Sequence, residues 1–325
     1  MLCDPFGRRI QYLRVSVTDR CNLRCVYCLP AEGVRWLPRE QVLRCEEIRD
    51  VVRAGAALGI THVRLTGGEP LVREGLAELV GMLAEIPQLT DLSLTTNGVL
   101  LAQCAQALAR AGLRRINISF DTLRPERFRD ITRFGTLDDV QAGIDSVLAA
   151  GLSPVKLNVV VMRGVNDDEI IELARLAVDR PLHVRFIELM PIGEFFSRER
   201  LVTSAEILAR LSALSQWRPT GSPAGCGPAQ TFTLDGAQGT VGIIGAVTQA
   251  FGAQCNRLRL TAAGHLRPCL DQESAVDVTP ALRPSVDHQR LAELIRAAVA
   301  AKPQQHAMVQ RETGSPRSCM AGVGG

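Results

Sequence analysis

Short apolar runs alternate with longer amphipathic stretches over residues 12–189. The apolar runs predict strands at residues 12–17, 62–66, 92–96, 115–120, 155–161 and 183–189. The stretches between them predict helices at residues 39–58, 73–86, 102–111, 136–150 and 167–178. Glycine follows three of these stretches, at Gly59, Gly112 and Gly151, and glycine is a common residue just after a helix end. Repeated strand-then-helix units predict an α/β fold, a partial (β/α)6 barrel of the TIM type.

The alternation stops near residue 192. Beyond it the pattern predicts a helix at 203–214, a strand pair at 231–234 and 240–244, and a last helix at 284–301, with a Gly-, Pro- and Ser-rich stretch at 215–228. We therefore predict two parts. Residues 1–192 form the barrel, and residues 193–325 form an α+β extension that closes its mouth.

Polar residues gather at the carboxyl ends of the predicted strands. They are Thr18-Asp19-Arg20, Thr66-Gly67-Gly68-Glu69, Thr95-Thr96-Asn97, Ser119, Asn158 and Glu188. A single Gly-Gly or Asn-Gly would indicate only a turn. In barrels of this type, however, the active site lies at the carboxyl ends of the strands. Six polar strand ends therefore predict one active site at the barrel mouth.

Three of the ten cysteines follow the first predicted strand in the pattern C-x3-C-x2-C, at Cys21, Cys25 and Cys28. Thiolates are the usual ligands of a cubane iron–sulfur cluster, and three of them leave one iron without a protein ligand. That iron can take a substrate or cofactor. A zinc knuckle or three unpaired thiols are the alternatives, but no fourth Cys or His lies near enough in sequence to favour zinc.

Composition limits the classes of function and the compartment that are compatible with the sequence. A net charge of +3 is too small to indicate a nucleic-acid or membrane surface, and 4% aromatic residues predict no base-stacking platform. The sequence has no apolar run of about 20 residues and no signal-peptide pattern, so we expect a cytoplasmic protein. In that reducing compartment, cysteines are metal ligands or free thiols, and we expect Cys3, Cys45 and Cys104 to be free.

The cysteine loop resembles that of the radical S-adenosylmethionine (SAM) enzymes, C-x3-C-x-aromatic-C, with Tyr27 as the aromatic residue. Gly67-Gly68-Glu69-Pro70 resembles the loop of those enzymes that contacts the SAM amino group. The resemblance implies a 4Fe-4S cluster on Cys21, Cys25 and Cys28 that binds SAM and cleaves it to a deoxyadenosyl radical. The SAM contacts it implies are Tyr27, Gly68, Ser119 and Met190.

Ordered matches over nearly the whole chain resemble one branch of that superfamily, the GTP 3′,8-cyclase family of molybdenum cofactor biosynthesis. They cover residues 4–8, 14–22, 94–98, 114–121, 155–160, 164–167, 185–188, 255–261 and the terminal Gly324-Gly325. The resemblance implies conversion of GTP to 3′,8-cyclo-7,8-dihydro-GTP, begun by hydrogen abstraction at C3′ of the ribose. It also implies that the terminal glycines reach the active site. The GTP contacts it implies are Arg14, Arg64, Thr95, Lys156, Arg257, Leu258 and Arg259.

The family's second cluster, which binds guanine, has the ligand pattern C-x2-C-x13-C, and this chain matches it only in part. Cys255 and Cys269 take the last two positions, but Gly252 stands at the first. Glycine has no side chain to bind iron, so we expect the second 4Fe-4S cluster to be absent, labile or altered. Cys226 and Cys319 are both candidates to stand in, and the sequence does not decide between them.

The resemblance further implies a flavodoxin-like electron donor and a downstream cyclic pyranopterin monophosphate synthase, and we expect a homodimer. Two other functions stay open. One is a radical SAM maturase of peptides or proteins, which the Arg257–Arg259 pair disfavours. The other is a non-catalytic iron–sulfur electron-transfer protein, which would not need the Gly-Gly-Glu-Pro loop or so large a barrel.

Overall fold

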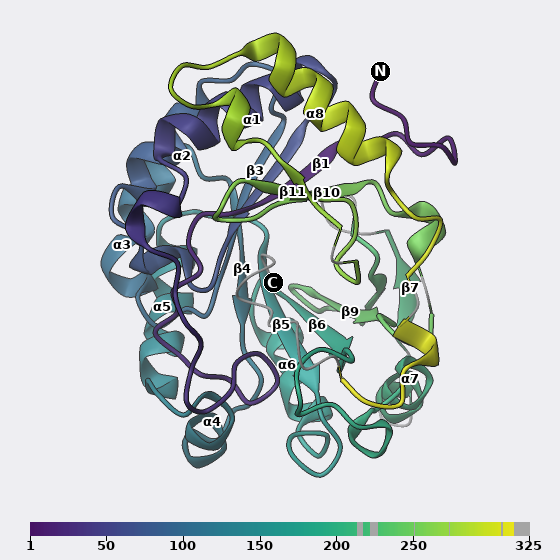
Figure 1. Ribbon diagram of the computed structural model, residues 1–325. Helices are drawn as coiled ribbons and strands as arrows, with labels where there is room; N and C mark the ends of the chain where they lie inside the picture. The colour runs from purple at the N-terminus through teal and green to yellow at the C-terminus, as the bar shows by residue number, and fades with distance from the viewer. Residues whose placement is uncertain (213–216, 222–226, 250, 273, 307, 315–325) are drawn as a thin grey trace.

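A computed structural model describes residues 1–212, 217–221, 227–249, 251–272, 274–306 and 308–314. Six strands pair in parallel and in sequence order to form the barrel wall (Figure 1). They are β1 (Tyr12–Ser16), β2 (His62–Thr66), β3 (Asp91–Thr96), β4 (Arg115–Ser119), β5 (Val155–Val161) and β6 (Leu182–Glu188). Each agrees with its predicted strand to within one residue at either end. The predicted (β/α)6 partial barrel is confirmed.

Helices follow each of the first five strands and cover the outer side of the wall (Figure 1). They are α1 (Cys45–Ala57), α2 (Leu76–Ala84), α3 (Leu101–Arg110), α4 (Pro125–Thr132), α5 (Leu137–Ala149) and α6 (Ile170–Asp179). Helices α1 and α2 are each shorter than predicted by at least five residues, whereas α5 and α6 are each shorter by two. A 3-10 turn (Arg39–Gln41) precedes α1, which begins where the Glu47 carboxylate accepts from the Arg44 amide at 2.7 Å. Helix α2 begins only after Gly75, whose φ is 74°.

The C-terminal extension adds strands to both edges of the barrel wall. Strand β9 (Thr240–Ile244) pairs in parallel with β6, and β10 (Arg257–Leu260) pairs in parallel with β1. In the described part of the chain this gives one sheet of twelve strands, β12-β11-β10-β1-β2-β3-β4-β5-β6-β9-β8-β7. The division at residue 192 therefore crosses a continuous sheet, and it stays a prediction.

The other elements of the extension are short or peripheral. They are α7 (Ser204–Ser212), β7 (Arg218–Thr220), β8 (Gln230–Thr233), β11 (His265–Arg267), β12 (Val276–Asp277) and α8 (His288–Ala300), with 3-10 turns at Arg198–Arg200, Gly252–Gln254, Thr279–Ala281 and Met308–Gln310. In the barrel part, a further 3-10 turn at Pro70–Val72 follows β2. Helix α8 packs on α1. No helix in the described ranges has the length and apolar character needed to span a membrane.

Alternate residues of the barrel strands face opposite ways, because side chains along a strand have a period of two. One set is apolar and buried beneath the helices, as Leu65, Ile116 and Leu157 are. The other set is largely polar and faces the barrel interior. Leu258 of β10 belongs to the apolar set, so its side chain lies in the core. A contact of Leu258 with GTP would therefore have to come from its backbone, and the predicted contact stays a prediction.

Candidate active site

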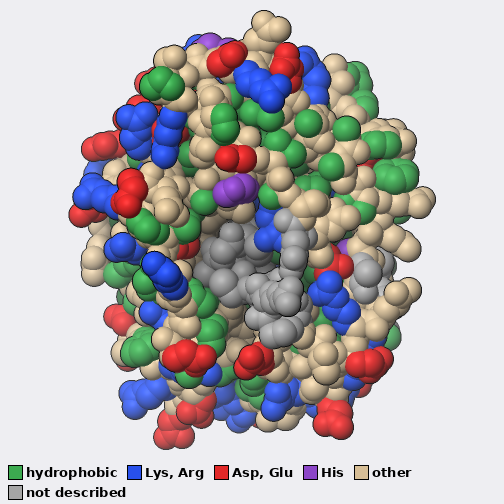
Figure 2. All heavy atoms as spheres, in the orientation of Figure 1, with side chains coloured by type: hydrophobic (Ala, Val, Ile, Leu, Met, Phe, Trp, Pro, Cys, Tyr) green, Lys and Arg blue, Asp and Glu red, His purple; other side chains and the backbone are tan. Residues whose placement is uncertain are grey.

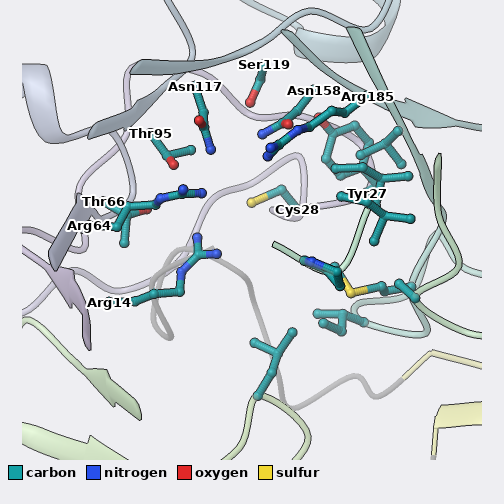
Figure 3. A pocket seen from close by; sticks show the side chains of 18 of the residues that line it. Arg14, Tyr27, Cys28, Arg64, Thr66, Thr95, Asn117, Ser119, Asn158 and Arg185 are labelled. Carbon is teal, nitrogen blue, oxygen red and sulfur yellow. The ribbon is translucent and has the colours of Figure 1, made fainter. Parts of the chain in front are cut away.

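A cavity of about 340 Å³ lies inside the barrel and opens at the carboxyl ends of its strands. Figure 3 shows part of its wall, and Figure 2 shows the whole molecule in the orientation of Figure 1, with basic and acidic side chains around the centre of the face. All five cysteines predicted to bind metal line it, namely Cys21, Cys25, Cys28, Cys255 and Cys269. The predicted ligand contacts that line it are Arg14, Tyr27, Arg64, Gly68, Thr95, Ser119, Met190, Arg257 and Arg259. The fold thus brings together residues that are up to 255 positions apart in sequence, from Arg14 to Cys269.

Helix α4 holds the cysteine loop in place. The amides of Arg24 and Val26 donate to the carbonyls of Thr132 and Ile131, at 3.0 and 2.9 Å. Arg133 ends α4 with a φ of 63°, a left-handed conformation that is unusual for arginine. Its Nη1 donates to the carbonyls of Arg24 at 2.7 Å and Leu29 at 3.1 Å. Neither α4 nor Arg133 was predicted from the sequence.

The Gly67-Gly68 pair fits against the segment that leads into the cysteine loop. The Gly68 amide donates to the Thr18 carbonyl, and the Glu69 amide donates to the Arg20 carbonyl, both at 2.8 Å. A Cβ atom on Gly68 would lie only 2.2 Å from the Arg20 carbonyl oxygen. The sequence predicted that these glycines admit a ligand. The structure shows a second reason for them, the close approach of two backbone segments.

Gly68→Ala is expected to displace the cysteine loop, because neither backbone can move away cheaply. We expect a loss of about 1–3 kcal/mol in stability, the usual range for overpacking, and a lower iron content after anaerobic reconstitution. Gly81→Ala is the matched control. Gly81 lies inside α2 with no atom within 4 Å of its added Cβ, so iron content should not change. Full iron loading of Gly68→Ala would contradict the steric argument.

Two buried carboxylates tie the strand ends together. Glu69 accepts hydrogen bonds from Thr96 Oγ1 at 2.6 Å and from the Asn97 amide at 2.7 Å, and burial raises the pKa of Glu69 to about 7. Asp121 accepts from the Tyr27 hydroxyl at 2.6 Å, and burial raises the pKa of Asp121 to about 6. Tyr27 thereby fixes the cysteine loop to the end of β4. The resemblance placed Glu69 in the loop that contacts the SAM amino group, and it assigned Asp121 no role.

Cations dominate the cavity wall. Among the described residues, eight basic and three acidic side chains line it: Arg8, Arg14, Arg64, Arg115, Arg185, Arg257, Arg259 and Lys302, and Glu69, Asp121 and Glu188. Burial, aided by neighbouring arginines, lowers the pKa of Arg14, Arg185 and Arg259, the last two to about 9 and about 10. The Glu188 carboxylate is occupied by the amides of Ser204 and Val247, each at 2.7 Å. A buried surplus of positive charge fits a polyanionic ligand.

Several polar atoms of the wall lack a hydrogen-bond partner within the described ranges. They are Arg14 Nε, Thr95 Oγ1, Asn158 Oδ1, the Tyr12 hydroxyl and both amide atoms of Asn117. Buried polar groups are normally paired, so a cluster of unpaired ones in one cavity fits a bound polar ligand. In Figure 3, Arg14 and Arg64 extend into the same space as Thr95 and Asn117.

Residues of the inner wall that the sequence analysis missed share one signal, a polar side chain at every second position of an apolar strand. Asn117 and Arg185 are such residues, and both line the cavity. Arg115 forms an ion pair with Asp91 across β3 and β4.

Lys156 lies beside Asn117 in register but is fully buried rather than part of the cavity lining. Burial, then Arg185, lowers the pKa of Lys156 to about 6. Its contact with GTP stays a prediction.

The predicted second cluster site holds two thiols and a lysine. Lys302 Nζ lies 3.6 Å from Cys255 Sγ. Burial by itself would raise the pKa of the Cys255 thiol, but Arg257 and Lys302 lower it. Cys226, Cys319, Gly324 and Gly325 lie outside the described residues. With Gly252 at the first ligand position, the described residues do not supply the three thiolates of the family pattern.

The two family profiles that match the chain together cover most of it. The profile of the Radical SAM superfamily matches residues 15–177, and that of Molybdenum Cofactor Synthesis C matches residues 182–308. The chain is 52% identical to the GTP 3′,8-cyclase of Pelotomaculum thermopropionicum, over 99% of each chain. It belongs to the GTP 3′,8-cyclase family of the radical SAM superfamily. The GTP 3′,8-cyclase of Heliobacterium modesticaldum, in the same family, is 50% identical over 100% of each chain.

Solved structures share the fold. SuiB of Streptococcus suis bound to S-adenosylmethionine superposes with a TM-score of 0.63 at 15% identity, over 84% of this chain and 64% of the longer SuiB chain. The full-length relatives and the two profiles confirm the family that the sequence motifs indicated. Membership of the radical SAM superfamily implies a 4Fe-4S cluster and SAM. Three thiols of the superfamily motif on the wall of one cavity fit that cluster.

Proposed function

We propose that the protein is a GTP 3′,8-cyclase, which converts GTP to 3′,8-cyclo-7,8-dihydro-GTP in the first step of molybdenum cofactor biosynthesis. The main support is full-length similarity to GTP 3′,8-cyclases at about 50% identity. The cavity adds to it, because the three thiols of the N-terminal motif and a cationic wall share one space. The chemistry that a cluster on these thiols would supply could therefore act on a nucleotide held by the arginines.

The N-terminal part of the site is assigned to the cofactor. Cys21, Cys25 and Cys28 would hold the cluster, which when bound supplies the electron that cleaves SAM. Tyr27, Gly68, Ser119 and Met190 would contact SAM. The chain's own part is to keep SAM and substrate in one orientation and to exclude water from the radical.

The arginine wall is assigned to GTP. Arg14, Arg64, Arg257 and Arg259 would bind triphosphate oxygens, since guanidinium forks match phosphate geometry. The Thr95 hydroxyl would form a hydrogen bond with GTP. Lys156, which is buried behind the cavity wall, is also assigned to GTP binding. A flavodoxin-like donor, a downstream cyclic pyranopterin monophosphate synthase, a homodimer and a cytoplasmic location stay predictions. No step is assigned to a second cluster, because the described residues do not fit one.

One assay tests the function and separates the alternatives. Anaerobically reconstituted, reduced protein is mixed with SAM, with and without GTP, and 5′-deoxyadenosine is measured together with the cyclised nucleotide. GTP-dependent release of both products is expected. Release that needs a peptide instead would favour a maturase, and no release under any condition would favour an electron-transfer protein.

Arg259→Met is expected to raise the Kd for GTP by roughly 10- to 100-fold, because a hydrogen bond to a charged group contributes roughly 1.5–3 kcal/mol. SAM binding and iron content should not change. Arg53→Met is the matched control, since Arg53 lies exposed on α1. Equal GTP affinities for wild type and Arg259→Met, measured by equilibrium binding, would remove Arg259 from the site.

A further inference from the structure

Position 252, where the family pattern has a cysteine, is packed against residues 305 and 306. A Cβ atom on Gly252 would lie 2.8 Å from Gln305 Cα and 3.4 Å from the His306 amide nitrogen. Those neighbours are backbone atoms, so a side chain fits at position 252 only if the segment moves. The chain after α8 therefore occupies the space that a third cysteine would need.

Lys302 connects the two remaining cysteine segments. It is buried at the end of α8, and its ammonium group faces three acceptors. Nζ donates to the carbonyls of Arg257 at 2.8 Å and Pro268 at 2.7 Å, and it lies 3.6 Å from Cys255 Sγ. An ammonium group has three donors, so Lys302 uses its full capacity here. One side chain thus joins the start of β10 to the residue before Cys269.

Arg8 fixes the same region from the N-terminal segment. Its Nη1 donates to the carbonyls of Gly252 at 2.5 Å and Gln304 at 2.8 Å, and its Nη2 donates to Pro303 at 2.6 Å. Asp4 orients the guanidinium group through a bond from Nε at 2.5 Å. Residues 4–8 matched the family pattern in the sequence, but the match assigned no role to any of them. The structure gives Arg8 one, as a link between Gly252 and the segment after α8.

We propose that Lys302 and Arg8 take the structural place of a second cluster, and hold the Cys255 and Cys269 segments and β10 in position without metal. A cluster ligated at three points would crosslink those segments. Here the buried Lys302 and the partly buried Arg8 crosslink them through carbonyl groups and one thiol. Arg257 and Arg259 of β10 are then positioned by Lys302 and Arg8. Both are positioning residues. That the positioned arginines bind GTP rests on the proposed function.

The first measurement does not depend on GTP. Hydrogen exchange of residues 252–269 is followed in reconstituted protein, in wild type and in Lys302→Met and Arg8→Met. Lys302→Met removes the hydrogen bonds to Cys255, Arg257 and Pro268, and Arg8→Met removes those to Gly252, Pro303 and Gln304. Exchange at residues 252–269 is therefore expected to accelerate at least tenfold, while exchange in the cysteine loop at 21–28 is unchanged. Arg9→Met is the matched control, because Arg9 is the exposed neighbour of Arg8. Unchanged exchange in both variants would overturn the proposal.

The second measurement separates the cations from a cluster. Iron content and the Kd for GTP are compared in wild type, Lys302→Met and Cys269→Ser. We expect Lys302→Met to weaken GTP binding roughly tenfold or more with unchanged iron, and Cys269→Ser to change neither by more than about threefold. Loss of about four irons together with GTP affinity in Cys269→Ser would overturn the proposal, since it would reveal a working second cluster.

Failure of the proposed function gives a different result. If the wild type does not bind GTP or release 5′-deoxyadenosine with it, the GTP assignment falls. The exchange measurement still decides whether Lys302 and Arg8 hold the segments. If the wild type binds GTP and exchange in the variants is unchanged, only the positioning proposal falls.

Discussion

Cys25→Ser is expected to reduce SAM cleavage to the background of cluster-free protein. The loss should exceed the roughly 10- to 100-fold caused by removing a residue that merely supports a metal ligand. Cys25 lies at the centre of the loop, where its carbonyl accepts from the amides of Cys28 at 2.9 Å and Leu29 at 3.0 Å. Serine should keep these backbone bonds, so the loop should stay folded. What is lost is the thiolate, and a serine hydroxyl is not a usual cluster ligand.

The measurements are iron content, the cluster absorbance and 5′-deoxyadenosine formation after anaerobic reconstitution. Cys104→Ser is the matched control. Cys104 is a half-buried free thiol on α3 whose Sγ donates to the Leu100 carbonyl at 3.2 Å, and it does not line the cavity. Its substitution should leave all three readouts unchanged. SAM cleavage by Cys25→Ser at a rate near that of wild type would mean that the N-terminal motif is not the SAM site.

Much of the barrel was predictable because its signals are local. Each inner strand carries an uninterrupted apolar set at alternate positions, as in β5, so burial on one side fixes both its length and its faces. The same period of two places Arg14 and Arg64 on the inner face of their strands. The two residues are in register on neighbouring strands and point into one cavity. Arginine within an apolar strand indicates either an ion pair or a ligand. Here Arg14 Nε has no partner within the described ranges, which favours the ligand.

Helix α4 was not predictable in the same way. It has eight residues, and only Phe128, Ile131 and Thr132 of them are buried. Phe128 and Ile131 lie on one face, but two apolar residues are too few to predict a helix, and the stability of so short a helix comes from packing rather than from its own sequence. Its role also depends on tertiary structure, because the carbonyls of its last residues accept hydrogen bonds from amides of the cysteine loop. The left-handed conformation of Arg133 is likewise not predicted by the backbone preferences of arginine.

The second cluster site illustrates a limit of motif reading. The sequence revealed that Gly252 lacks a ligand, but a missing side chain does not say what fills its place. The answer lies about 50 residues away, where residues 305 and 306 pack on Gly252 and Lys302 reaches Cys255. Arg8 adds a third segment from the other end of the chain. Contacts of such separation depend on the completed sheet, in which β10 lies beside β1.

Gly252→Cys is expected to create a second cluster site and to raise iron from about four toward about eight per chain, the content of two 4Fe-4S clusters. The new thiol would complete the C-x2-C-x13-C pattern with Cys255 and Cys269. The substitution also has a cost, since its Cβ would lie 2.8 Å from Gln305 Cα and residues 303–306 must shift. Before reconstitution we therefore expect the variant to be less stable than wild type by about 1–3 kcal/mol.

Gly252→Ser separates the ligand from the crowding. Serine brings the same Cβ and nearly the same bulk but no thiolate, so it should lose the same stability and gain no iron. In Gly252→Cys, bound cluster should offset the loss, because a ligand that binds only the folded state stabilises it. The measurements are iron content and thermal unfolding, before and after reconstitution. Iron that stays near four in Gly252→Cys would show that the Cys255 and Cys269 segments, as Lys302 and Arg8 hold them, cannot close around a cluster even when the third thiol is present.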